Sequence, residues 1–254
     1  YEFDQVRSAI DTLARNTGKL QLTMSGTAKG KVRTKLKIRP NPYQTWYQFW
    51  YRTRTIYEMQ NNAIIVPILD EYGEVSGLFP VLPSSCEVVQ TKNGKEYLRY
   101  TFANNQKAAI ELDRCGIVSK FLYKSDIKGD SNEALTPTMQ LLHIQTQGIK
   151  EGIKNSASIR FMATLANLMK KDDIAKERKS WVEDNLGVDA GGLALFPSSY
   201  TNVQQIKSEA TLVNPELMKI AETRVLNYFG CNEDILQNRA VGDKWSGYYE
   251  GKIE

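Results

Sequence analysis

The chain has 254 residues, 41% of them hydrophobic and 24% charged, so it can bury a substantial core and is not disordered as a whole. No apolar run approaches the roughly 20 residues that span a bilayer, and the three cysteines have no metal-binding spacing. The net charge is +4, but residues 1–60 hold eleven basic and four acidic side chains, a balance of +7, which leaves −3 for the remainder. A simple DNA-binding domain is more uniformly basic than this.

The first predicted element is an amphipathic helix over residues 2–15, with Val6, Ile10 and Leu13 on one face. In the segment 29–39, every second residue is basic, which predicts a strand with one charged face and one apolar face. The charged face would consist of Lys29, Lys31, Arg33, Lys35, Lys37 and Arg39. Two interpretations remain open for it: a solvated edge strand protected by charge, or a surface that contacts phosphate.

The middle of the chain favours one more helix and then β-structure. Thr45 predicts the start of a helix that runs to about Met59 and carries an aromatic core stripe. The following segments predict a small antiparallel sheet, in which Asn93-Gly94 is a strong hairpin signal. Its predicted strands are 63–69, 75–79, 86–91, 96–102, 107–112 and 117–123, and a polar loop follows at 125–133.

The second half of the chain is predicted to be mainly helical. A long helix over 137–161 contains Gly148 and Gly152, one turn apart, which indicates either close packing against a neighbour or a weak, bent helix. A shorter helix begins at Asp172 and Asp173, with Ile174, Trp181 and Leu186 as its apolar stripe, and a strand follows at 192–196. Asn214-Pro215-Glu216 predicts the start of a helix that ends at Gly230.

No group of residues supports catalysis. The single histidine, His143, lies among apolar residues of the predicted long helix and is interpreted as structural. The glycine-rich segment 25–32 lacks the spacing of a phosphate-binding loop, and Val32 stands where such a loop needs Ser or Thr. We therefore predict no catalytic residue, no metal site and no cofactor, and expect that the protein is not an enzyme.

Several short motifs follow one another in a defined order. They are Ala9-Ile10-Asp11-Thr12-Leu13-Ala14, Arg39-Pro40-Asn41-Pro42, Gly73-Glu74-Val75 with Leu82-Pro83, Leu135-Thr136-Pro137, and Phe229-Gly230 with Ile235-Leu236. In this order, over nearly the whole chain, the sequence resembles the portal proteins of HK97-type tailed bacteriophages. It departs from the family pattern at Asn61-Asn62, where the family has Gly-Asn, and at Cys231-Asn232, where the family has Val-Pro.

The resemblance implies an α+β portal-type fold and a division into five segments. An α/β wing with an antiparallel sheet would cover 1–133, a stem helix 134–161, a small β-α-β clip 162–200 and a second stem helix 201–230. Residues 231–254 would form a tunnel loop and the start of a following helix that is cut short. The resemblance places Asn238, Arg239 and Lys244 in the tunnel loop, and the mixed charges of the first stem helix suggest that Lys150 and Lys154 also face the channel.

The resemblance also implies a function and a set of partners. The expected protein is a portal: a homo-oligomeric ring, a dodecamer, that forms the DNA channel at one capsid vertex for genome packaging and ejection. Its expected partners are double-stranded DNA, terminase, capsid or scaffold proteins and head–tail connector proteins, with no membrane. It would assemble in the bacterial host cytoplasm and reside in the virion. Lys176, Arg178 and Lys179 are the candidate surface for terminase or an adaptor, with a merely solvated helix face as the alternative.

Two other classes of protein remain as alternatives. The first is a non-catalytic DNA-binding accessory protein that grips DNA with the basic segment 29–39 and is a monomer or dimer. The second is a nuclease or other phosphoryl-transfer enzyme, which needs a clustered acidic metal site that the sequence does not display. Rings in solution would favour the portal over both.

Overall fold

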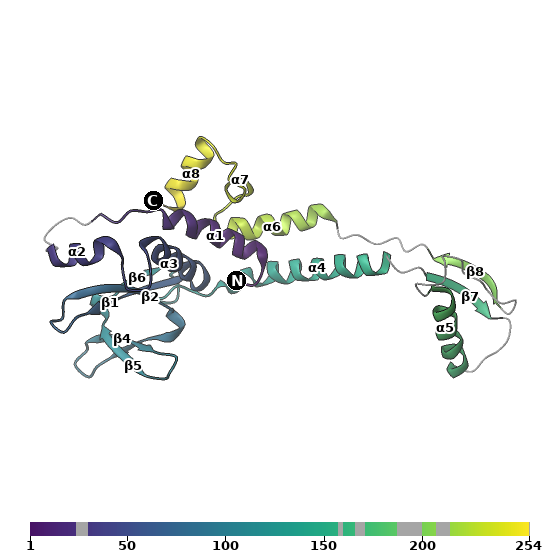
Figure 1. Ribbon diagram of the computed structural model, residues 1–254, viewed down its shortest axis with the longest axis horizontal. Coiled ribbons are helices and arrows are strands. Elements are labelled where there is room, and N and C mark those ends of the chain that lie inside the picture. Colours follow the sequence, from purple (N-terminus) through teal and green to yellow (C-terminus); the bar gives the residue numbers. More distant parts are fainter. Residues whose placement is uncertain (24–29, 157–159, 166–170, 187–199, 207–213, 254) are drawn as a thin grey trace. The chain divides into compact units, whose positions relative to one another are not determined.

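The computed structural model describes residues 1–23, 30–156, 160–165, 171–186, 200–206 and 214–253. They form two compact units, a larger one of Tyr1–His143 with Glu216–Glu254 and a smaller one of Ile144–Pro215. The helices in Figure 1 are α1 (Asp4–Gly18), α2 (Gly30–Ile38), α3 (Trp46–Gln60), α4 (Thr136–Ser156), α5 (Lys171–Leu186), α6 (Pro215–Phe229), α7 (Glu233–Leu236) and α8 (Asp243–Lys252). The strands are β1 (Asn62–Leu69), β2 (Val75–Val81), β3 (Cys86–Gln90), β4 (Glu96–Thr101), β5 (Lys107–Glu111), β6 (Gly116–Ser119), β7 (Arg160–Leu165) and β8 (Tyr200–Ile206).

Helices α1 and α3 form for the reasons visible in the sequence. The predicted apolar stripe of α1 is confirmed, since Val6, Ile10 and Leu13 are all buried. Thr45 begins α3 with a reciprocal capping box, in which its hydroxyl accepts from the backbone N–H of Gln48 and the Gln48 side chain accepts from the Thr45 N–H. The helix ends at Asn61, which adopts the left-handed conformation that asparagine tolerates.

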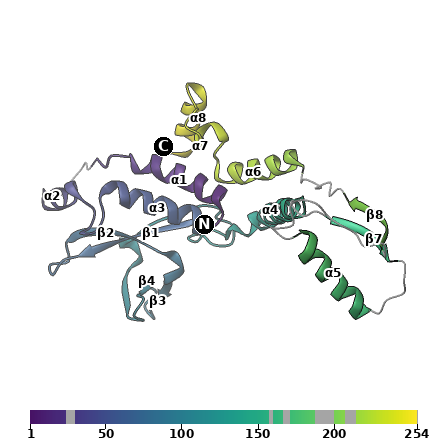
Figure 2. The same ribbon diagram turned by 45° about the vertical axis from the view of Figure 1, so that its right-hand side comes forward.

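The predicted antiparallel β-structure is present, but it forms two sheets instead of one. The first sheet has the order β2-β1-β6 and the second the order β3-β4-β5. The Asn93-Gly94 hairpin joins β3 to β4, with Gly94 at a φ of 78°. Figures 1 and 2 show α3 on one side of the first sheet and the second sheet on the other side. The mixed helices and antiparallel sheets confirm the α+β fold class.

The predicted strand over 29–39 is wrong, because Gly30–Ile38 forms helix α2. Val32 and Leu36 are four residues apart, so the same sequence also fits a helix with both residues on one face. Leu36 is only 4% exposed where α2 contacts β2. The indole N–H of Trp46 donates to the Leu36 carbonyl at 2.8 Å, which attaches the helix to the start of α3. Lys29 lies outside the described residues.

The core of the larger unit joins segments from both halves of the chain. Apolar side chains of α1 pack against α6, α7, α8 and the start of α4. The cluster contains Val6, Ala9, Ile10, Leu13, Leu135, Leu142, Ala221, Val225, Phe229, Cys231, Ile235 and Tyr248. The C-terminal segment is therefore an integral part of the unit that the first residues build.

The smaller unit has the chain order β7-α5-β8, and its two strands pair antiparallel. The long helix α4 ends at Ser156, before the predicted end at 161, because Phe161 belongs to β7 and pairs with Gln205 of β8. The predicted strand 192–196 lies outside the described residues, as does Gly187. The predicted helix after Asp172 and Asp173 is confirmed as α5.

Candidate functional site

The predicted tunnel-loop residues lie in the connection between α7 and α8. Asn232 caps α7, since its side chain accepts from the Ile235 N–H at 2.9 Å. The chain then turns through Asn238, which has a φ of 56°, and Arg239 donates its backbone N–H to the Asp234 carbonyl at 2.7 Å. Helix α8 begins at Asp243, so Lys244 lies in its first turn. Residues 237–242 thus form a short, hydrogen-bonded surface connection.

Both cations of this connection are paired with acids of α7. The Lys244 ammonium lies 2.6 Å from the Asp234 carboxylate, and the Arg239 guanidinium lies 3.9 Å from the Glu233 carboxylate. The hydrogen bond from Lys244, together with its charge, holds the pKa of Asp234 below its ordinary value. The connection therefore presents polar groups and balanced charge, and exposed pairs of this kind contribute little to stability.

The other predicted channel residues lie on α4. Lys150 and Lys154 are exposed, and Lys154 pairs with Glu151 at 3.0 Å. His143 is exposed, and its ring lies edge-on to Phe3 with the ring centroids 6.4 Å apart. A Cβ added to Gly152 would meet no atom within 4 Å, so no described part of the chain packs closely against this glycine.

Helix α5 carries the candidate partner surface. Lys176, Arg178 and Lys179 are exposed, whereas Trp181 is partly buried. Glu183 lies one turn from Lys179, and their charged atoms are 3.9 Å apart. Acidic residues are interspersed along the helix, which gives α5 a mixed surface instead of a uniformly basic one.

Four basic residues of the 29–39 segment belong to helix α2 and so do not share one strand face: Lys31, Arg33, Lys35 and Lys37. Lys31 and Arg33 lie within α2, and the side chains of Lys35, Lys37 and Arg39 are exposed. Lys35 donates to Asp70 at 3.0 Å, and this hydrogen bond lowers the pKa of the Asp70 carboxyl. Because residues two apart in a helix lie on different faces, and Lys35 is already paired, the alternating phosphate-facing surface expected of a strand does not form.

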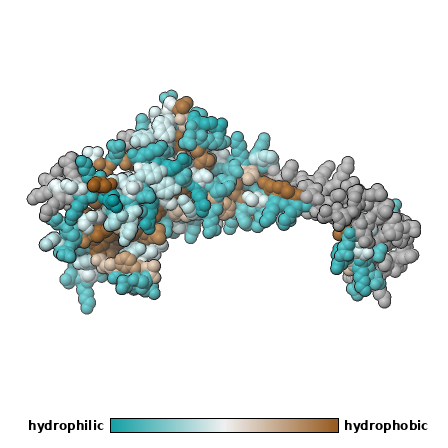
Figure 3. All heavy atoms as spheres, in the orientation of Figure 1, coloured by the Kyte–Doolittle hydropathy of each residue, from teal (hydrophilic) through white to brown (hydrophobic). Residues whose placement is uncertain are grey.

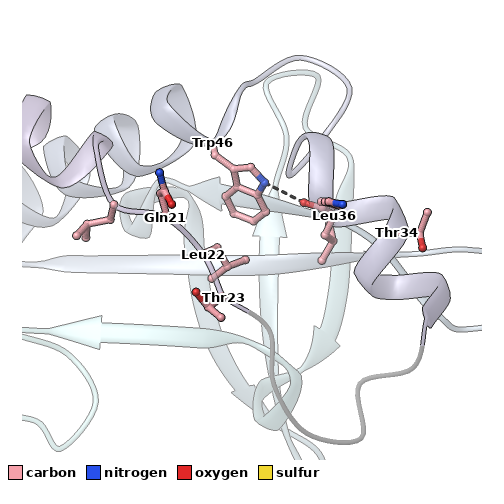
Figure 4. A pocket seen from close by; sticks show the side chains of 8 residues that line it. Gln21, Leu22, Thr23, Thr34, Leu36 and Trp46 are labelled. Atoms are coloured by element: carbon pink, nitrogen blue, oxygen red, sulfur yellow. Dashed lines mark hydrogen bonds between the residues drawn. The ribbon is translucent and has the colours of Figure 1, made fainter.

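A cavity of about 520 Å³ lies beside α2 (Figure 4). It is lined by Leu20, Gln21, Leu22, Thr23, Thr34, Leu36, Lys37 and Trp46. Lys37 is the one ionisable residue among these eight, so the described lining residues offer no pair of groups for acid–base chemistry.

Sequence reasoning missed a buried ionic cluster at the end of α3. Glu58 is 1% exposed, and its carboxylate pairs with Arg54 at 2.9 Å and also with Lys120, which follows β6. Burial lowers the pKa of Lys120, while the charge of Glu58 acts in the opposite direction. The Lys120 ammonium also lies 5.8 Å from the centre of the Phe229 ring, and Arg54 donates to the Lys252 carbonyl at 3.0 Å. The cluster therefore fastens α3 and β6 to α6 and α8.

A sequence signal for part of this cluster was present. Arg54 and Glu58 are four residues apart in a helix that is otherwise rich in aromatic residues, which is the spacing of a helical ion pair. The contact with Lys120 had no such signal, because a distant strand end supplies it.

The described residues were also compared with the requirements of a metal site and of a membrane-spanning helix. No group of three or more His, Cys, Asp or Glu side chains among them is arranged to hold a metal ion. Within the same residues, every helix is too short or too polar to cross a membrane.

Comparisons with known proteins identify similar sequences and folds. The family described as phage portal protein matches residues 4–254. The fold is similar to a chain in the neck of a native gene transfer agent particle computed with C12 symmetry, at 14% identity and a TM-score of 0.72, covering 98% of this chain and 72% of that chain. It is also similar to an HK97 family phage portal protein from Corynebacterium diphtheriae, at 15% identity and a TM-score of 0.58, covering 98% and 81% of the two chains. No curated protein matches the sequence.

Proposed function

The chain belongs to the phage portal protein family, and from this premise we propose how its own residues serve the ring-shaped channel that carries DNA at one capsid vertex. A portal passes DNA during genome packaging and ejection, and it connects the head to the neck. The match over residues 4–254 is the observation that carries this function.

The ring is a dodecamer of identical subunits. A neck structure with C12 symmetry contains a chain of similar fold, which supports this number. A closed ring needs a heterologous interface, in which one surface of each subunit contacts a different surface of the next. The role is structural, and the ATP hydrolysis that drives packaging is left to terminase.

The connection between α7 and α8 faces the channel lumen, together with Lys150 and Lys154 of α4. Arg239 and Lys244 are each matched by an acid of α7, so the connection is electrically balanced. DNA affinity rises steeply with the number of phosphates that a protein neutralises. Balanced charge therefore allows the duplex to slide past without being held.

The outer surfaces contact protein partners. The exposed cations of α5, Lys176, Arg178 and Lys179, form the surface for terminase or an adaptor, within a clip built from β7, α5 and β8. The wing contacts capsid, scaffold and head–tail connector proteins. The ring assembles in the host cytoplasm and resides at the portal vertex of the virion; virion and neck particles of a gene transfer agent contain chains of similar fold.

The assembly state tests this function. The purified chain at high concentration is expected to sediment as a large oligomer and to appear as rings with a central channel in negative-stain electron micrographs. A protein that stays monomeric or dimeric and binds duplex DNA in a strongly salt-dependent manner would instead be a DNA-binding accessory protein. That result would overturn the portal function.

A further inference from the structure

An apolar tip projects from the larger unit after β6. Phe121, Leu122 and Tyr123 follow one another there and are 49%, 52% and 88% exposed. Phe121 has a φ of 57°, which a bulky residue adopts only when its surroundings hold it there. Large apolar groups are seldom left together in water without a partner. We name residues 121–123 the tip.

The tip is held in place by the chain around it. The Asp130 N–H donates to the Phe121 carbonyl at 3.1 Å, and the Lys120 N–H donates to the Asn61 carbonyl at 2.9 Å. The Asn61 side chain donates to the Asp130 carbonyl at 2.6 Å. On the inner side, the Phe121 ring lies 5.8 Å from the Tyr228 ring, centroid to centroid. The loop is thus preorganised, which reduces the entropy lost when the tip binds a partner.

An apolar groove of about 440 Å³ lies between the two sheets of the same unit. Strands β1 and β2 form one wall and β4 and β5 the other, with Arg52 at the rim. The lining includes Val66, Ile68, Phe79, Val81, Leu98, Tyr100, Phe102, Ala108 and Ile110. Figure 3 shows hydrophobic surface gathered over β1 and β2 on the face it presents. Phe102 is 46% exposed there and stacks edge-on with Tyr100, their ring centroids 4.8 Å apart.

The tip and the groove lie at different places on the first sheet. The strand order is β2-β1-β6, and the tip follows edge strand β6, whereas the groove lies against the face of β2 and the second half of β1. A single copy therefore presents an apolar projection and an apolar hollow on separate surfaces. This is the arrangement that a head-to-tail ring contact requires.

Charged groups of both signs lie beside the two surfaces, with Arg52 at the rim of the groove. Lys124 and Lys128 are exposed next to the tip, with exposed Asp126 between them. At the far end of the groove, the turn between β1 and β2 carries exposed Glu71 and Glu74. Opposite charges that meet around an apolar contact fix its orientation and speed association.

We propose that the tip of one copy docks into the intersheet groove of the next copy, and that this contact is a repeated joint of the ring. The inference rests on the ring assembly proposed above and names the surfaces that build it. A fully exposed aromatic side chain can bury about 150–250 Å². Because Phe121 is already half covered by its own chain, the two rings of the tip bury less than twice that area. A stable interface buries about 1,600 Å² in total, so the tip forms the apolar centre of a larger contact.

Two complementary variants test the contact. Leu122→Asp places a charge on the tip and leaves the groove intact, whereas Ala108→Glu places a charge in the groove at exposed edge strand β5 and leaves the tip intact. Each variant alone is expected to lose ring formation at a concentration where the parent chain is fully assembled. An equimolar mixture is expected to form dimers, because the intact tip of one variant enters the intact groove of the other and no further subunit can be added.

Analytical ultracentrifugation measures these species, and circular dichroism with thermal melting verifies that each variant is folded. The matched controls Val88→Asp and Ala103→Glu place the same charges at exposed positions outside both surfaces, and they are expected to keep the rings. If both variants form rings as the parent does, or if their mixture contains monomers alone, the tip–groove contact is wrong while the portal function stands. A parent chain that forms no rings overturns the portal function, and this proposal with it.

Discussion

Two groups of ion pairs in the larger unit use the same chemistry in different surroundings. At the end of α3, Glu58 is buried with Arg54 and Lys120, whose side chains are only 14% and 15% exposed. In the connection between α7 and α8, the side chains of Lys244 and Arg239 are 66% and 63% exposed. Removing one partner of a buried pair costs about 3–5 kcal/mol, whereas an exposed pair contributes about 0–1 kcal/mol. The buried cluster therefore holds elements together, and the exposed pairs set the charge of a surface.

The largest expected effect comes from breaking the buried cluster. Glu58→Ala leaves Lys120 and Arg54 without their carboxylate and is expected to lower the free energy of unfolding by about 3–5 kcal/mol. Urea denaturation followed by circular dichroism measures the change. Glu233→Ala, which removes an exposed acid, serves as the matched control and is expected to cost less than about 1 kcal/mol. Equal losses in the two variants would contradict the comparison.

The backbone beside the cluster is also tightly packed. A Cβ at Gly129 would lie 2.0 Å from the Lys120 carbonyl oxygen and 2.8 Å from that of Asn61, so backbone must move to accommodate it. Gly129→Ala is expected to lower the free energy of unfolding by about 1–3 kcal/mol. Gly247→Ala is the control, because a Cβ there meets no atom within 4 Å on helix α8, and it is expected to be neutral or stabilising. A neutral Gly129→Ala variant would show that this junction is not closely packed.

Removing the exposed cations is expected to change how DNA is packaged and retained, and not how stably the chain folds. Replacing both Arg239 and Lys244 by Ala is expected to change the free energy of unfolding by less than about 1 kcal/mol. If the connection lines the channel, the length of DNA packaged and the fraction retained should both change. The control is Lys95→Ala with Arg114→Ala, two exposed cations that both pair with Glu111 on the second sheet. Unchanged packaging and retention, with the connection on the outer wall of the ring, would defeat the assignment.

The smallest expected effect is a pH dependence of the exposed pair. The pKa of Asp234 is lower in the folded chain because Lys244 donates a hydrogen bond to it. The ionised carboxylate therefore contributes stability at pH values above about 4, the ordinary Asp pKa, and this contribution is lost as the pH falls through the folded value. The parent chain and Asp234→Asn should differ slightly at pH 7, and their thermal unfolding curves should converge toward pH 2–3. A difference that stays constant over this range would exclude the ion pair as its cause.

Local signals in the sequence predicted much of the fold. The α1 stripe, the helix start at Thr45 and the Asn93-Gly94 hairpin each depend on neighbours within a few residues, and each is confirmed. The strand prediction for segment 29–39 was wrong because its residues fit both the two-residue period of a strand and the 3.6-residue period of a helix. The contact between α2 and β2, where Leu36 is buried, favours the helix. The predicted end of the long helix at residue 161 was wrong for a related reason. Pairing with the distant strand β8 places Phe161 in β7.

The candidate site was only partly predictable for the same reason. The family resemblance led to the proposal that Arg239 and Lys244 lie in the tunnel loop. Their pairing with Glu233 and Asp234 depends on how the chain turns back after α7. The contact of Glu58 with Lys120 joins a helix to a strand end far along the chain. Such contacts have no signature in a local pattern.

The shared core of α1, α6 and α8 has a consequence for the order of events during translation. The apolar face of α1 emerges from the ribosome before Val225 and Phe229, which cover it and are synthesised roughly 200 residues later. At about 5–20 residues per second, the nascent chain waits on the order of 10–40 s with this face uncovered. During that interval the uncovered face of α1 is a hydrophobic surface through which the nascent chain is prone to aggregate.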